Sequence, residues 1–136
     1  MTTRVTVIDI LLKEFKSSYN LSYPVSYTNN EDFIKPTNTP WIKFDIVNNN
    51  SEQAGFSTEG NRRFRRFGII SYQVYVPPNT GTYNGGEICN TINNIFEGKR
   101  FDDVYCETGS WSEIGIVDND FFMFQGIIYF NFDEIK

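Results

Sequence analysis

The sequence predicts an α+β domain with a mostly antiparallel β-sheet and two helices packed on one face. Two segments, 5–19 and 84–96, place apolar side chains at steps of three and four residues, which is typical of amphipathic helices. Several other segments alternate apolar and polar residues, which is typical of half-buried strands. The order of helix, strands, helix and strands contains no alternating βαβ units, so an antiparallel sheet is favoured. The 136 residues are expected to form a single domain over 1–136 with its own core.

The N-terminal helix is expected to bury one apolar stripe. The residues of this stripe are Val5, Ile8, Leu12, Phe15 and Tyr19. Thr2 or Thr3 can cap its N-terminus. The alternating segment 20–27 then predicts a short strand, and Pro24 favours an edge position because proline cannot donate to a ladder.

Two strands on either side of a polar segment are expected to pair as a hairpin. After a polar loop over 28–40, residues 41–47 alternate, and residues 68–76 alternate until two prolines end the strand. The segment 48–61 between them is rich in asparagine and glycine and holds one large apolar residue, Phe56. Long loops inside compact domains tend to be functional, so we interpret 48–61 as a mobile polar contact arm anchored by Phe56. A passive loop is the alternative.

The second helix carries start and stop signals in its sequence. Asn84 and Glu87 have the spacing of a capping box, and Tyr83 and Ile88 that of a hydrophobic staple. Gly98 fits the left-handed position that ends many helices. The predicted buried face consists of Ile88, Ile92, Ile95 and Phe96.

The C-terminal part is expected to consist of strands. Segments 101–107 and 111–117 are predicted strands joined by a turn at 108–110, and 118–120 is a predicted tight turn. The last strand has two different faces. One face carries Phe122, Phe124, Ile128, Phe130 and Phe132 around Gly126, and the other carries Met123, Gln125, Ile127, Tyr129 and Asn131.

Charge and composition exclude several functional classes. The net charge of -5 and the isoelectric point near 4.7 disfavour a basic nucleic-acid reader or an anionic-membrane binder. No apolar run reaches the roughly twenty residues of a membrane span, and the first residues lack the features of a signal peptide. We therefore expect synthesis in the cytoplasm and no membrane partner. Cys89 and Cys106 lie far apart, which does not indicate a disulfide framework.

The residues that usually carry catalysis are sparse. The chain has no histidine, which removes the histidine-based triads and the usual zinc ligand sets. The glycine-rich segment NTGTYNGGE precedes a helix but lacks the spacing of nucleotide-binding loops. Asp102, Asp103, Asp118 and Asp120 could form a carboxylate or magnesium site, although solvated acids at loops are the simpler interpretation. We therefore expect that the protein is not an enzyme and that it binds no metal and no cofactor.

One dense basic cluster stands out in the acidic chain. Arg62, Arg63, Arg65 and Arg66 alternate with Phe64 and Phe67, and could grip phosphates while the rings stack on bases. Strand alternation would split these arginines over two faces, which makes a poor single groove. Interface residues that bridge acidic neighbours, or charges that guard an edge strand, are the favoured interpretations.

The abundance of aromatic residues is compatible with assembly. Thirteen phenylalanines and eight tyrosines are more aromatic surface than a small core easily hides. Either some of this surface faces partner subunits or the core is simply aromatic-rich.

Several motifs in order resemble one family. They are the N-terminal helix, the opening PWI of the strand at 40–42, the arginine-rich entry to the strand at 67, the turn VPPNTGT over 76–82, the segment INNIFEGKRF over 92–101, Trp111, and the closing strand at 128–130. Together they resemble the tail terminator, or tail completion, proteins of long-tailed bacteriophages. The loops 28–40 and 48–61 are outside this resemblance.

The resemblance implies a structural protein of the virion tail. It implies a homo-oligomeric ring, a hexamer by analogy, that caps the tail tube, ends its polymerisation and joins the tail to the head connector. Partners would be the tail tube protein and a head-connector or neck protein, and DNA would pass through the lumen without specific binding. An acidic protein suits such a pore, because like charges keep DNA from sticking. The alternatives are another neck or tube component, or a small nucleic-acid-binding module that uses the arginine cluster.

Three surfaces are predicted to make subunit or partner contacts. They are the arm at Phe56, the segment with Arg62, Arg63, Arg65 and Arg66, and the second face of the last strand at Gln125, Tyr129 and Asn131. A ring whose contacts are head-to-tail needs two different patches on each subunit.

Overall fold

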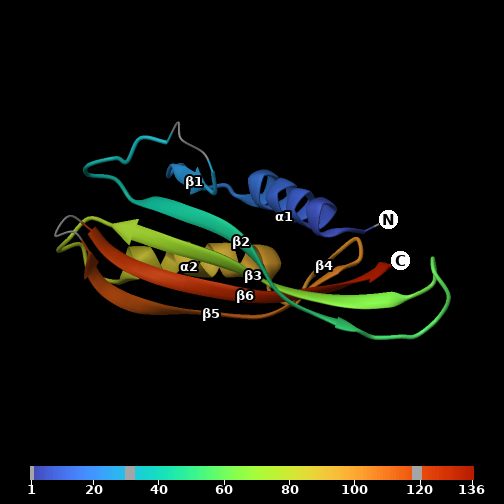
Figure 1. Cartoon of the computed structure of the whole chain (residues 1–136). Coiled ribbons are helices and arrows are strands. Elements are labelled where there is room, and N and C mark those ends of the chain that lie inside the picture. Colours follow the sequence, from blue (N-terminus) through green and yellow to red (C-terminus); the bar gives the residue numbers. More distant parts are fainter. Residues whose placement is uncertain (1, 30–32, 118–120) are drawn as a thin grey trace.

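The computed structural model describes residues 2–29, 33–117 and 121–136, which form two helices and six strands (Figure 1). The elements are α1 Arg4–Ser18, β1 Val25–Tyr27, β2 Trp41–Gln53, β3 Arg63–Val76, α2 Tyr83–Phe96, β4 Arg100–Phe101, β5 Val104–Val117 and β6 Phe121–Ile135. The helices and strands therefore follow one another in the expected order. The acids at 118 and 120, and the turn predicted there, lie outside the described residues.

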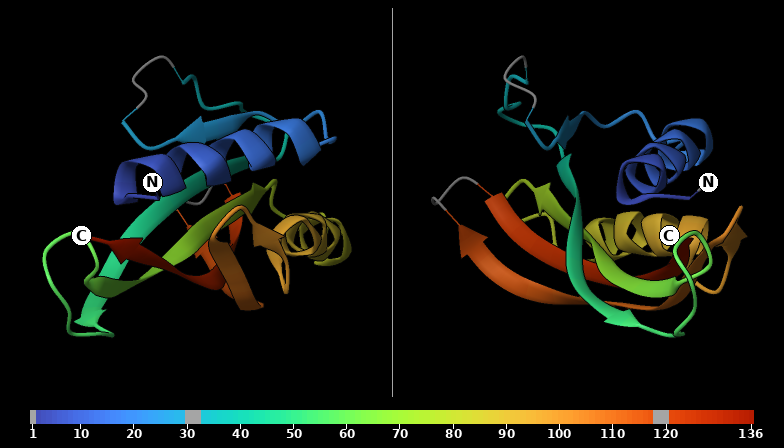
Figure 2. Two further views of the ribbon diagram at one scale, coloured as in Figure 1. Left: turned by 90° about the vertical axis from the view of Figure 1, so that its right-hand side faces the viewer. Right: turned by 45° about the vertical axis from the view of Figure 1, so that its right-hand side comes forward.

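The strands form one curled sheet in the order β1-β2-β3-β6-β5-β4 (Figure 2). Only β1 and β2 pair in parallel, and the other four pairs are antiparallel. The prediction of a mostly antiparallel sheet is thus confirmed. β1 lies at an edge, as Pro24 indicated, and β3 ends at Val76 directly before the two prolines. β3 and β6 occupy the centre of the sheet.

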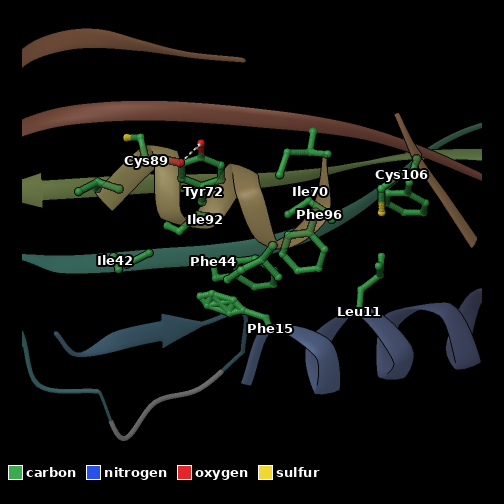
Figure 3. Close-up of a cluster of buried hydrophobic side chains, with 14 of the residues drawn as sticks. Leu11, Phe15, Ile42, Phe44, Ile70, Tyr72, Cys89, Ile92, Phe96 and Cys106 are labelled. Atoms are coloured by element: carbon green, nitrogen blue, oxygen red, sulfur yellow. Dashed lines mark hydrogen bonds between the residues drawn. The ribbon is translucent and has the colours of Figure 1, made fainter. Parts of the chain in front are cut away.

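The buried side chains of both helices join one core cluster with those of β2, β3 and β6 (Figure 3). The ring of Phe15 on α1 lies 4.2 Å from that of Phe44 on β2 and 6.3 Å from that of Phe96 on α2, centroid to centroid. These three rings therefore pack together where both helices meet β2.

The buried stripe of α1 differs from the predicted one by part of a turn. Val7, Leu11 and Phe15 are fully buried, whereas Val5 is exposed. The buried stripe from Val7 follows four-residue steps, and the predicted stripe from Val5 follows mixed steps of three and four. Both patterns fit a helix with many apolar residues, so the spacing alone could not show which stripe is buried. The expected cap is confirmed, because Thr3 and Thr6 form a reciprocal capping box.

The start of α2 contradicts the predicted capping box. Thr82 is the N-cap residue, it makes no side-chain cap bond, and Asn84 lies within the first turn. The helix is positioned by packing instead. A side chain at Gly85 would overlap the ring of Phe124, and one at Gly86 would lie 3.1 Å from Trp111. At the other end Gly98 has the expected positive φ, 71°.

The β2–β3 hairpin is longer than the sequence suggested. β2 continues to Gln53 and pairs with β3 as far as Phe64, so residues 48–53 are strand rather than arm. Cross-strand backbone bonding overrides the poor strand preference of the three asparagines there. The connecting loop is therefore 54–62, and it closes with a hydrogen bond from the Ala54 amide to the Arg63 carbonyl.

β5 is also longer than predicted. It is one strand from Val104 to Val117, and the predicted turn at 108–110 is an irregularity in its pairing with β6 between Cys106 and Gly109. A β-bulge can accommodate residues that favour a turn while the strand continues. The two predicted faces of β6 are confirmed at most positions. Phe124, Ile128, Phe130 and Phe132 are buried, whereas Met123, Gln125, Ile127 and Asn131 are partly exposed and Tyr129 is exposed.

The second face of the sheet has its own aromatic cluster at one end. The rings of Trp41 and Tyr75 stack at 4.1 Å, Phe121 meets both edge-on, and Phe33 covers Trp41 at 5.3 Å. The loop before β2 thereby covers this end of the second face, while the centre of that face stays open.

Candidate assembly surfaces

Arg63, Arg65 and Arg66 of the arginine cluster lie on β3, in the middle of the sheet, and are paired within the chain, whereas Arg62 directly precedes β3. β3 runs between β2 and β6, so the interpretation as edge-strand guards is wrong. Arg65 and Arg66 are level with Asp133 and Phe132 of β6, and their charges meet the carboxylates of Asp133 and Glu134. β6 thus supplies the acidic neighbours that the sequence analysis assigned to a partner subunit.

The predicted split of the arginines over two faces is confirmed. Arg65 donates two hydrogen bonds, of 3.0 and 3.3 Å, to the two carboxylate oxygens of Asp133, and Arg63 lies 3.7 Å from the same carboxylate. The hydrogen bonds that Arg65 donates to the Asp133 carboxylate raise the pKa of Arg65 above its usual value. Consecutive strand residues point to opposite faces, so Arg66 and Glu134 form their bond on the other face.

The pair of Arg66 and Glu134 is the more buried of the two. The guanidinium lies 3.3 Å from the carboxylate, and the two side chains are only 17% and 8% exposed. The guanidinium also lies over the ring of Phe64, and Lys136 lies 3.8 Å from the second oxygen of Glu134. A buried charge is tolerated when it is paired and hydrogen-bonded, and this pair joins β3 to the end of β6.

A concave surface of about 730 Å³ lies at this end of the second face. Its charged lining consists of Arg63, Arg65, Arg100, Asp103, Glu107 and Asp133. Three arginines and three acids leave it without net charge, and two salt-bridged groups account for five of the six residues. This surface lacks the single-sign charge of a phosphate groove, which weakens the interpretation as a nucleic-acid-binding module.

Phe56 lies in the 54–62 loop, which extends past the end of both helices (Figure 1). Its side chain is 90% exposed. The hydrogen bonds that order the loop are local, such as the bond from the Asn61 amide to the Thr58 carbonyl. The side chain therefore projects from the body of the domain, as an anchor for a partner requires.

Gln125, Tyr129 and Asn131 lie on the second face of β6, as predicted, away from the core cluster. Tyr129 is level with Ile69 of β3, which is level with Val47 of β2. This apolar row crosses the open centre of the second face. The structure brings the three groups of predicted contact residues together only in part. Asn131 lines the concave surface with Arg63 and Arg65, and the 54–62 loop begins beside Arg63, whereas Gln125 and Tyr129 lie outside that surface.

The sequence analysis missed two open sheet edges. β1 pairs only with residues 42–44 of β2, and β4 pairs only with residues 104 and 105 of β5. The Lys99 carbonyl and the Gly98 amide extend the second pairing to Cys106 and Glu107, so within the described residues the outer edges of β2 beyond 44 and of β5 beyond 107 have no neighbouring strand. An open edge offers a row of free backbone donors and acceptors to another chain. Alternation along one strand shows which face it buries, but not which strand will lie beside it, so no sequence signal marked these edges.

The structure offers little that suggests catalytic chemistry. No group of three histidine, cysteine or acidic residues that could hold a metal exists in the described part of the chain. Burial raises the pKa of the thiols of Cys89 and Cys106 to about 12, so both stay protonated at neutral pH. Close packing explains the two glycines at the start of α2, because a side chain at Gly85 would overlap the ring of Phe124 and one at Gly86 would press against Trp111. No helix among the described residues is long and apolar enough to span a membrane.

Of the comparisons with known proteins, one identifies a family and another shows a similar fold. A family model described as phage tail terminator protein matches residues 6–110. No curated protein sequence matches this chain. Solved structures do match, and one of them aligns with a TM-score of 0.72 at 12% identity, covering 97% of this chain and 96% of the other. At that identity the likeness concerns the fold alone.

Proposed function

The chain belongs to the phage tail terminator family, and from this premise we propose that it forms a closed homo-oligomeric ring, a hexamer, on top of the tail tube. The family makes it a structural component of the phage tail, located in the virion, and not an enzyme. In the proposal the ring ends the polymerisation of the tube protein and joins the tail to the head connector. DNA passes through its lumen.

The two open edges carry the proposal of a ring. They lie on opposite sides of one sheet, at β2 and at β5, so they are two different patches on each subunit. A contact between different patches is head-to-tail, and it closes into a ring when the rotation per subunit fits. Both helices would pack on one face of this sheet, and the net charge of -5 would keep DNA from adhering to the ring.

The predicted contact residues keep distinct roles in this proposal. Phe56 projects from the subunit and would anchor it to a neighbouring subunit or to the tube. Arg63 and Arg65, which share Asp133, would contribute by shaping the concave surface rather than by supplying free charge. The row at Tyr129, with Gln125 and Asn131, stays a predicted contact surface.

Native mass spectrometry over a concentration series tests the ring. We expect one discrete oligomer, of six subunits, that grows at the expense of the monomer. A monomer at all concentrations, or an open series of sizes, would contradict a ring that closes by itself.

Adding the protein to polymerising tail tube protein tests its place in the tail. We expect tube growth to stop, with the added protein at one tube end in electron micrographs. Unchanged tube growth would overturn the terminator role. Salt-dependent DNA binding that is lost when the arginines of segment 62–66 are replaced would favour the nucleic-acid-binding module.

A further inference from the structure

The open edge of β5 ends in two exposed isoleucines. Ile114 is 52% exposed and Ile116 is 64% exposed. Ile116 is level with Phe122 of β6, which packs against the core cluster, so Ile116 lies on the same face of the sheet as the core. Most of its side chain has nothing to pack against in its own subunit.

The open edge of β2 lies beside an apolar pocket. The pocket has a volume of about 250 Å³, and it lies between α1 and the sheet, where β1 ends and leaves β2 uncovered. Ile8 and Leu12 of α1 and Tyr27, Phe44 and Ile46 of the sheet form its apolar lining. Its two polar residues, Thr28 and Asp45, hydrogen-bond to each other. The remaining surface of the pocket is suited to an aliphatic side chain.

We propose that Ile116 of one copy fills this pocket of the next copy, while its β5 pairs antiparallel with the open part of β2. This inference rests on the proposed ring and identifies the contact that closes it. The partner is a second copy of this chain, because both complementary features belong to the same subunit, at opposite edges of one sheet.

The strand directions favour this pairing. Four strands, β2, β3, β6 and β5, span the sheet between the two open edges, and each neighbouring pair is antiparallel. β2 and β5 therefore run in opposite directions. A copy placed head-to-tail brings its β5 beside β2 in the antiparallel sense, and side chains on the core face continue onto the core face of the neighbour. Ile116 and Ile46 then share a face.

The displacement along the strands also agrees with a closed ring. Within one subunit Ile46 is level with Ile70, Ile128 and Gly109, and Phe44 is level with Gly126 through β3. Ile116 is level with Phe122, which precedes Ile128 by six residues and Gly126 by four. Strands of a closed sheet tilt by about 35–45°, so four strands spaced about 4.8 Å apart shift the rows by roughly four to six residues. A shift that carries the row of Phe122 to the row of Gly126 or Ile128 in the next copy places Ile116 level with Phe44 or Ile46, at the pocket.

Paired cysteines test the contact directly. Ile46→Cys and Ile116→Cys in one chain, treated with a short bis-maleimide cross-linker at pH 7, should give a covalent ladder that ends at the size of the ring. The native thiols do not interfere, because Cys89 and Cys106 are buried and protonated. The matched control combines Ile116→Cys with Val5→Cys, because Val5 is exposed on α1 and lies outside the pocket. This control should give no ladder.

A second variant tests the energetics. Ile116→Ser should raise the protein concentration for half-assembly by at least about tenfold, because each contact loses the burial of an isoleucine. Val5→Ser should leave this concentration unchanged. Wild-type rings with no ladder, and with assembly that is insensitive to Ile116→Ser, would overturn this contact and leave the ring itself standing. A wild-type protein with no ring-sized species would overturn both proposals.

Discussion

The two ends of the sheet are stabilised by different interactions. Under α2, strands and helix approach so closely that Gly85 and Gly126 leave no room for a side chain, with Phe124 and Tyr72 filling the space. At the other end, which we call the arm end, residues 48–53 and 63–67 and the end of β6 are joined by backbone pairing and by ion pairs such as that of Arg66 with Glu134.

The difference separates the closely packed part of the molecule, which stabilises the fold, from the exposed parts that are free to bind. Close packing leaves little freedom to rearrange, since interiors have crystal-like density. The arm end carries the exposed Phe56 and part of the open edge of β2. We expect substitutions of the closely packed glycines to unfold the subunit, and substitutions of exposed residues such as Phe56 to affect assembly.

The largest effect is expected at Gly126. The side chain of Gly126→Val would overlap the ring of Tyr72. The Tyr72 hydroxyl donates to Asn93 at 2.5 Å, so the ring cannot move away without breaking a buried hydrogen bond. We expect a loss of about 3 kcal/mol or more in the free energy of unfolding, measured by urea denaturation. The control is Gly55→Ala, where the added carbon would meet Arg63 at an ordinary 3.7 Å. Equal losses in the two variants would refute the contrast.

Arg66 tests whether buried charge matters at the arm end. Arg66→Met leaves Glu134 buried beside the more distant Lys136, and we expect a loss of about 2–3 kcal/mol in the free energy of unfolding. Arg65→Met should cost much less, because its pair with Asp133 is partly exposed. Thermal denaturation of both variants measures the difference, and a larger loss in Arg65→Met would show that exposure does not decide the effect.

The two buried thiols are expected to make the free energy of unfolding depend on pH. Burial raises the pKa of Cys89 and of Cys106 from the ordinary 9.0 to about 12. Above pH 9 the unfolded chain releases these protons while the folded chain keeps them, so stability falls between pH 9 and 12 and is unaffected below pH 9. At pH 10 each thiol should cost about 1.4 kcal/mol. Urea denaturation at pH 8 and pH 10 should show this loss in the wild type, and Cys89→Ala with Cys106→Ala should remove most of it.

Phe56 is expected to have the smallest effect on the subunit. Its side chain is almost fully exposed, so Phe56→Ser should change the free energy of unfolding by less than about 0.5 kcal/mol. The ring or its attachment to the tube should nevertheless weaken in native mass spectra and in the tube-growth assay. Tyr83→Ser provides an exposed aromatic control at the other end of the molecule. A Phe56→Ser protein that assembles like the wild type would remove the arm from the contact surfaces.

Local patterns predicted the elements better than their ends. The alternation in β3 and β6 and the stop signals at Val76 and Gly98 were confirmed, because each depends on a few neighbouring residues. The end of β2 was missed, since residues 48–53 become strand through pairing with β3. The capping box at Asn84 was wrong, because contacts with Phe124 and Trp111 set the start of α2.

The candidate site was predictable only as a set of exposed residues. Phe56 and Tyr129 were expected at the surface and are exposed. The acidic partners of Arg65 and Arg66 lie 68 residues away in sequence, and no spacing rule connects them. The family resemblance, carried by the order of several short motifs, is confirmed by the match over residues 6–110.

The fold class, the order of helices and strands, and the face that each central strand buries could be predicted from the sequence, because periodicity and turn chemistry act within a few residues. Only the tertiary structure decided which strands are neighbours, which charges are paired, and which edges of β2 and β5 remain open. These features depend on contacts between segments that are distant in sequence, and such contacts leave the open strand edges that another chain can pair with.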